Sequence, residues 1–114
     1  MGTILIVDDD PAVYEFVAAA VRAMGLEAVC AANGWEGLAK FQASPGRFDL
    51  VLTDVIMPFM DGNEMIRRIR RLRPDIRIIC MTGTPGCVTE AVSVLYKPFQ
   101  YSSLAASIRG CYAA

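Results

Sequence analysis

Short runs of apolar residues alternate with segments of helical periodicity along the whole chain. The runs cover residues 3–7, 28–31, 48–53, 76–81 and 92–96. The first run is continuous and β-branched, which is typical of a strand buried on both faces. Because most of these runs are followed by a helical pattern, the alternation predicts a parallel sheet with helices on both faces. The expected fold class is therefore α/β, a three-layer sandwich.

The helical segments have recognisable ends. Asp10 and Pro11 predict an N-cap and a first helical position, and Gly25 predicts the end of that helix. The third helix stops before Pro74, and a last helix runs from about Tyr101 to the end of the chain. Apolar stripes at helical spacing mark these segments: Val13, Phe16, Val17, Ala20, Val21 and Met24; Trp35, Leu38 and Phe41; Met65, Ile66, Ile69 and Leu72; Leu104, Ile108 and Cys111.

Composition limits the size of the protein and its partners. A length of 114 residues predicts one domain over residues 1–114, and a hydrophobic fraction of 54% excludes intrinsic disorder. The formal net charge of -1 gives no general attraction to nucleic acid or to anionic lipid. No apolar run approaches the roughly 20 residues of a membrane span. We therefore expect no direct nucleic-acid partner and no membrane partner.

Two residue types restrict the chemistry further. Histidine is absent, which excludes a His-based triad, a phosphohistidine carrier and a His-ligated zinc site. The four cysteines, Cys30, Cys80, Cys87 and Cys111, show no CxxC spacing. They are interpreted as free thiols, three of them in the core, in a reducing compartment, so a cytoplasmic location is expected.

Polar side chains follow four of the expected strands where each strand ends. Asp8 and Asp9 follow the first, Asp54 the third, Thr82 the fourth and Lys97 the fifth. In an open parallel sheet, ligands bind beyond the carboxyl ends of the strands, at the point where the strand order reverses. Three carboxylates, a hydroxyl and an ammonium group should therefore meet in one cleft.

This set of groups suits phosphoryl transfer. Carboxylates at this density repel one another unless a cation neutralises them, and oxygen ligands favour Mg²⁺. One carboxylate can then act as a nucleophile and become an aspartyl phosphate, while Thr82 and Lys97 bind the remaining phosphoryl oxygens. Three other features are interpreted as structural: Asp10 is a helix cap, Trp35 packs on the second helix, and the arginines of the third helix form a solvated face.

Several motifs together resemble the receiver domain of bacterial two-component response regulators. They are Ile4-Leu5-Ile6-Val7-Asp8-Asp9-Asp10-Pro11, Leu50-Val51-Leu52-Thr53-Asp54-Val55-Ile56-Met57-Pro58, Met60-Asp61-Gly62, Met81-Thr82-Gly83 and Tyr96-Lys97-Pro98-Phe99. The resemblance covers essentially the whole chain. It implies a flavodoxin-like sheet of five parallel strands in the order 2-1-3-4-5.

The resemblance also implies a role for each residue. Asp54 corresponds to the phosphoacceptor, Asp9 to a direct Mg²⁺ ligand and Asp8 to a residue that holds the ion largely through water. The backbone carbonyl of Ile56 completes the protein ligands, while Thr82 and Lys97 correspond to the hydroxyl and lysine that bind the phosphoryl group. The phosphoryl group would come from a phosphohistidine of a histidine kinase or a histidine phosphotransfer domain. The receiver would catalyse only its own phosphorylation and slow dephosphorylation, rather than conventional turnover.

One segment departs from the family pattern. Only residues 84–91 separate the fourth and fifth strands, and Pro85 and Gly86 oppose helix formation. The fourth helix should therefore be reduced to an irregular loop or one turn, with the fifth strand still parallel. Val94 occupies the position of the family's aromatic switch residue, so output should come from reordering of this loop. The lost helix should expose an apolar face that binds a second copy or a partner, and the Lys97-Pro98 bond should be cis.

Other functions remain open at this stage. The chain could be a receiver-like interaction module that works without phosphorylation. It could also be a Mg²⁺-dependent phosphohydrolase, although such enzymes usually place a second Asp two positions after the nucleophile, where this chain has Ile56. The sequence does not distinguish a stand-alone receiver from the receiver of a hybrid histidine kinase.

Overall fold

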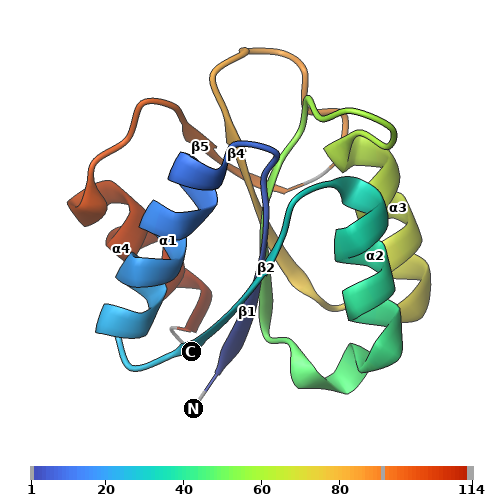
Figure 1. Ribbon diagram of the computed structural model, residues 1–114, viewed down its shortest axis with the longest axis horizontal. Helices are drawn as coiled ribbons and strands as arrows, with labels where there is room; N and C mark the ends of the chain where they lie inside the picture. Colours follow the sequence, from blue (N-terminus) through green and yellow to red (C-terminus); the bar gives the residue numbers. More distant parts are fainter. Residues whose placement is uncertain (1, 91, 113–114) are drawn as a thin grey trace.

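A computed structural model describes residues 2–90 and 92–112 of the chain (Figure 1). The strands are β1 (Thr3–Val7), β2 (Glu27–Ala31), β3 (Leu50–Asp54), β4 (Arg77–Thr82) and β5 (Ser93–Tyr96). The helices are α1 (Pro11–Ala23), α2 (Gly34–Ala43), α3 (Gly62–Leu72) and α4 (Tyr101–Tyr112), with a short 3-10 helix over Pro45–Arg47. None of the helices in the described part of the chain is long and apolar enough to cross a membrane.

The five strands form one parallel sheet in the order β2-β1-β3-β4-β5. Helices α1 and α4 cover one face of the sheet, and α2 and α3 cover the other (Figure 1). The strand order reverses at β1 and β3, so their carboxyl ends flank the crevice where ligands bind in such sheets. The predicted α/β sandwich, the strand order and the parallel β5 are confirmed.

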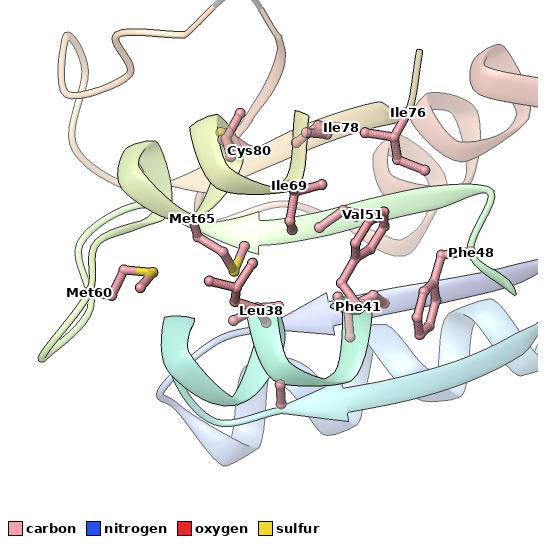
Figure 2. Close-up of a cluster of buried hydrophobic side chains, with 14 of the residues drawn as sticks. Leu38, Phe41, Phe48, Val51, Met60, Met65, Ile69, Ile76, Ile78 and Cys80 are labelled. Atoms are coloured by element: carbon pink, nitrogen blue, oxygen red, sulfur yellow. The ribbon is translucent and has the colours of Figure 1, made fainter. Parts of the chain in front are cut away.

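Two apolar cores hold the sheet between its helices. Figure 2 shows the core under α2 and α3, where Leu38, Phe41, Met65 and Ile69 pack toward Val51 of β3. Each of these side chains is buried, and full burial of one such side chain stabilises the fold by roughly 1.5–3 kcal/mol. The other core joins α1 and α4 to the opposite face of the sheet. Strands buried on both faces fix the positions of their carboxyl ends, where the polar residues lie.

Side-chain caps set the start of three helices. Asp10 accepts a hydrogen bond from the backbone N–H of Ala12 at 3.0 Å, as its predicted capping role requires. Asn33 caps α2 in the same way, and Asp61 caps α3. Helix α1 ends at Ala23, two residues before Gly25, whose φ of 81° is the left-handed conformation expected after a helix.

The connection between β4 and β5 contains no helix in its described residues, 83–90 and 92. The predicted irregular loop is therefore confirmed. Part of the loop replaces the missing helix, since Cys87, Val88 and Val92 pack against the core under α2 and α3. The apolar face predicted to be open is thus partly closed by the chain itself. At its outer edge Tyr96 is exposed and Val94 is half-buried.

Three expectations need correction. Phe48 and Asp49 precede β3 instead of belonging to it; Phe48 is buried, and its ring stacks on Phe41 with centroids 5.7 Å apart. Of the cysteines only Cys80 is buried, whereas Cys30, Cys87 and Cys111 are half-buried, because they lie at edges of the layers. All four are free thiols.

Trp35 does not pack into the second helix's core face; it is 52% exposed, and the guanidinium of Arg68 lies 5.3 Å from its ring centroid. Arg67 and Arg71 of α3 are exposed, as expected of a solvated face. Arg67 and Arg68 form salt bridges with Glu64, and Arg73 donates to the backbone carbonyls of Pro45 and Phe48.

Candidate functional site

The sequence-predicted polar residues meet at the carboxyl edge of the sheet. Asp54 and Thr82 are the last residues of β3 and β4, while Asp8 and Lys97 directly follow β1 and β5. Asp54 pairs in register with Met81, so Thr82 lies one position further along the neighbouring strand. The Lys97–Pro98 peptide bond is cis, as predicted. Parallel pairing therefore brings together groups that are as far as 89 positions apart in the sequence.

Lys97 connects two carboxylates across this edge. Its Nζ donates to Asp8 Oδ2 at 2.8 Å and to Asp54 Oδ2 at 3.2 Å. Burial of Lys97 lowers its pKa, but the hydrogen bond that it donates to Asp8 and the charges of Asp8 and Asp54 outweigh that effect and raise the pKa overall. The side chain is thus a fixed positive charge beside Asp54.

Asp8 is fully buried, and its two carboxylate oxygens have separate partners. Oδ1 accepts the backbone N–H of Asp10 at 2.9 Å, and Oδ2 accepts from Lys97. Burial raises the pKa of Asp8, while the hydrogen bonds from Lys97 and Asp10 oppose that rise. A buried carboxylate that is held rigidly in this way orients its neighbours instead of serving as an exposed nucleophile.

Asp8, Asp9 and Asp54 form the acidic cluster of the site. One carboxylate oxygen from each lies within 4.8 Å of the others. Asp8 is buried, Asp54 is half-buried and Asp9 is exposed, so the cluster opens to solvent on one side. Hard carboxylate oxygens with room for water fit Mg²⁺, which keeps several water ligands. The donor set is therefore suitable for the predicted cation.

The loop after Asp54 exposes two large apolar side chains. Ile56 is 59% exposed, and Phe59 is 85% exposed with a φ of 73°. Such a φ is strained for a bulky residue and is common near functional sites. The loop ends at Gly62, where an added Cβ would lie 2.2 Å from the backbone oxygen of Asp54. Gly62 therefore allows α3 to approach the backbone of Asp54.

The hydroxyl of Thr82 has partners in the β4–β5 loop. Thr82 is buried, and its Oγ1 accepts the backbone N–H of Thr84 at 3.1 Å and lies 3.2 Å from Cys87 Sγ. The Thr82 hydroxyl therefore contacts the β4–β5 loop, the segment that was predicted to lack the fourth helix.

Sequence reasoning missed Asn63 and gave Cys87 no role. Asn63 is buried in the first turn of α3. Its side-chain amide forms hydrogen bonds with the backbone of Cys87 and Thr89 in the β4–β5 loop. A signal was present: Asn63 shares the buried side of α3 with Ile66, three positions on, where an apolar residue is expected.

A hollow of about 460 Å³ lies beside the site. It is lined by Ala12, Val13, Phe16, Lys97, Pro98 and Phe99, and the rings of Phe16 and Phe99 have centroids 6.3 Å apart. This apolar surface adjoins the acidic cluster through Lys97.

The fold and the site together define a flavodoxin-like α/β domain with an acidic cluster and a lysine at the point where the strand order reverses. Residues 4–109 match the response regulator receiver domain family. The chain belongs to this family, and it is a receiver domain of two-component signalling.

Individual relatives agree with this assignment. The chain is 33% identical over 111 residues to the response regulator receiver protein CpdR of Brucella abortus, with 91% of each chain covered. It is 34% identical over 103 residues to the DNA-binding transcriptional regulator NtrC of Azospirillum brasilense, covering 88% of this chain. The receiver domain of the hybrid histidine kinase CckA superimposes with a TM-score of 0.88, 31% identity and coverage of 98% and 100%.

The extent of these matches differs among the relatives. The chain spans 20% of the NtrC protein and 12% of the sensor kinase CckA of Brucella abortus, whereas it spans 91% of CpdR. The similarity to the longer proteins therefore concerns their receiver portion.

Proposed function

We propose that Asp54 is the phosphoacceptor of this receiver and that its phosphorylation switches protein–protein contacts. The observation that carries the proposal is the Lys97 ammonium held 3.2 Å from Asp54 and 2.8 Å from Asp8. Phosphoryl transfer requires mainly positioning and neutralisation of negative charge, and this contact supplies both beside one carboxylate. The proposal covers residues 1–114 as a single receiver domain.

The donor is a phosphohistidine of a histidine kinase or a histidine phosphotransfer domain. A carboxylate oxygen of Asp54 attacks phosphorus and forms a P–O bond while the P–N bond breaks. The electron pair of that bond stays with the imidazole, which carries a proton on its other nitrogen and leaves neutral. Asp54 is half-buried and lies beside the exposed Asp9, so a donor can approach the acidic cluster from solvent. The apolar hollow beside Lys97 supplies a surface for the donor protein.

Asp9 and Asp54 would hold Mg²⁺ directly, with Asp8 acting largely through water and the backbone carbonyl of Ile56 completing the protein ligands. When bound, the ion neutralises charge on the carboxylates and on the phosphoryl oxygens. Lys97 provides a second positive charge, and the Thr82 hydroxyl donates to a phosphoryl oxygen. The domain completes its own phosphorylation and slow dephosphorylation and is no conventional turnover enzyme.

Intact mass after incubation with Mg²⁺ and a small phosphodonor tests this function. We expect one phosphoryl adduct on the wild-type protein and none on Asp54→Asn. An absence of any adduct on a folded wild-type protein would instead support the interaction module that works without phosphorylation. Sustained release of phosphate over many turnovers would support a phosphohydrolase.

We also propose that a second copy binds the face altered by the missing helix. Val94 pairs with Cys80 and Tyr96 with Thr82, so both share the face that α2 and α3 cover elsewhere. Strand β5 is an edge of the sheet, and Tyr96 is 55% exposed there. Sedimentation velocity should detect a dimer that Tyr96→Lys weakens; a monomer at all concentrations would contradict this part.

A cytoplasmic location belongs to the same proposal, since the four cysteines are free thiols, as in a reducing compartment. The proposal includes no direct nucleic-acid partner and no membrane partner. A net charge of -1 gives the domain no general attraction to nucleic acid or to anionic lipid.

A further inference from the structure

Asn63 is a buried polar residue that the phosphorylation chemistry does not use. The buried polar or charged residues in the described part of the chain are Asp8, Thr53, Asn63 and Thr82. Asp8 and Thr82 belong to the site, and the Thr53 hydroxyl donates to the backbone oxygen of Asp54 at 2.7 Å. Burial of an amide is costly unless its donor and acceptor are both used, so the partners of Asn63 indicate what it does.

The donor and the acceptor of the Asn63 side-chain amide both form hydrogen bonds with the backbone of the β4–β5 loop. Nδ2 donates to the carbonyl of Cys87 at 2.9 Å, and Oδ1 accepts the N–H of Thr89 at 3.1 Å. One planar amide therefore binds the segment on both sides of Val88, in the way that a neighbouring strand would. This pair of bonds supplies backbone partners to a loop whose described residues form no helix.

The same segment contacts the hydroxyl of the site. Cys87 Sγ lies 3.2 Å from Thr82 Oγ1, and the N–H of Thr84 donates to that oxygen. Asn63 directly follows Gly62 in the chain. The backbone of Gly62 lies against that of Asp54, and the N–H of Gly62 donates to the carbonyl of Val55 at 2.7 Å. The contacts therefore run from Asp54 through the start of α3 and the loop to Thr82.

We propose that Asn63 is a positioning residue that acts through Cys87 to set the orientation of the Thr82 hydroxyl. The contacts of Asn63 with Cys87 and Thr89, together with the Cys87–Thr82 contact, are called the Asn63–Cys87 clamp. The proposal rests on the proposed function, because it concerns the hydroxyl that binds the phosphoryl group. In the protein without a phosphoryl group the clamp keeps the hydroxyl against Cys87 and the loop.

The clamp opposes binding of the phosphoryl group. In the proposed clamp the Thr82 hydroxyl directs its one proton at Cys87 Sγ, so donation to a phosphoryl oxygen competes with that contact. The N–H of Thr84 uses a lone pair of the same oxygen and holds it in place. A contact that exists only in the ligand-free conformation stabilises that conformation. It therefore lowers the affinity for a ligand that binds a different conformation. Loosening the clamp should therefore tighten the binding of a phosphoryl mimic.

Calorimetric titration with beryllofluoride in saturating Mg²⁺ tests the proposal. We expect Asn63→Ala and Cys87→Ala each to tighten binding by about three- to tenfold, the factor that one neutral hydrogen bond contributes to an equilibrium. Cys87→Ala leaves the backbone bonds to Asn63 possible, so it tests the clamp even if Asn63→Ala does not fold. Cys111→Ala removes another half-buried thiol, away from the site, and should leave the affinity unchanged.

A double-mutant cycle separates positioning from general stability. In a Thr82→Ala background, Asn63→Ala and Cys87→Ala should each change the affinity less than twofold, because the hydroxyl on which they act is gone. The same tightening in that background, or unchanged or weaker affinity in both single variants, would overturn the proposal while leaving the proposed function intact. An absence of beryllofluoride binding by the wild-type protein would overturn the proposed function and this proposal with it.

Discussion

Lys97 Nζ donates to Asp8 Oδ2 at 2.8 Å, although β5 and β1 are separated in the sheet by β3 and β4. The lysine therefore extends over the carboxyl ends of the two intervening strands, and on the way its Nζ also contacts Asp54. The buried Asp8 carboxylate depends on this cation, because burial alone would disfavour its charge.

Replacement of Lys97 should destabilise the domain in the absence of Mg²⁺. Lys97→Met leaves the buried carboxylate of Asp8 unpaired, which should cost about 2–4 kcal/mol in the free energy of unfolding. Addition of Mg²⁺ should restore part of the loss, since the ion supplies another positive charge at the cluster. Urea unfolding with and without Mg²⁺ measures both effects; equal stability of the variant and the wild type would refute the dependence on Lys97.

The approach of α3 to Asp54 gives a second prediction. Gly62→Ala places a Cβ 2.2 Å from the backbone oxygen of Asp54 and 2.8 Å from Val55 Cα, so the backbone must shift. We expect a loss of about 1–3 kcal/mol together with slower phosphorylation. The matched control is Gly110→Ala in α4, where an added Cβ meets nothing within 4 Å and should stabilise the helix by up to about 1 kcal/mol. Similar effects of the two substitutions would contradict this interpretation.

The side chain at position 56 should control the lifetime of the phosphorylated form. Ile56 is two residues past Asp54 and exposed, and its apolar side chain cannot orient an attacking water. Ile56→Asn supplies an amide for that purpose and should accelerate dephosphorylation on the order of tenfold, the effect of one hydrogen bond in the transition state. The decay of the phosphoryl adduct by intact mass provides the rate, and an unchanged rate would count against the prediction.

The environments of the cysteines predict selective labelling. Burial raises the pKa of Cys80 to about 12, so near pH 8 only about one part in ten thousand is thiolate, the reactive form. Cys80 should therefore resist iodoacetamide in the native protein and react in urea, whereas the half-buried Cys30, Cys87 and Cys111 should react first. If peptide mapping found Cys80 among the first labelled sites of the native protein, the burial of Cys80 in β4 would be contradicted.

The strands, the helix ends and the polar edge could be predicted from the sequence because each depends on local information. Asp10 and Pro11 begin α1 as predicted, and the acidic and basic residues directly follow apolar runs whose carboxyl ends must lie on one edge. Thr82 and Lys97 were brought into that set by the parallel direction of β4 and β5.

The remaining errors concern contacts between segments that are distant in the sequence. Trp35 lies at helical spacing from Leu38, but its ring projects toward Arg68 of α3, which no local pattern encodes. Asn63 could not be given its role, because its partners Cys87 and Thr89 lie 24 and 26 positions away in a loop with no periodicity. Tertiary packing decided both positions.

The central claim, that Asp54 accepts the phosphoryl group, is tested most directly by locating the modification. An aspartyl phosphate is reduced by borohydride to homoserine, so treatment of the Mg²⁺- and phosphodonor-incubated protein followed by peptide mapping marks the modified residue. We predict homoserine at position 54 alone, with unmodified aspartate at positions 8 and 9 in the same sample. Homoserine at another position, or at none while the intact protein carries a phosphoryl adduct, would contradict the assignment.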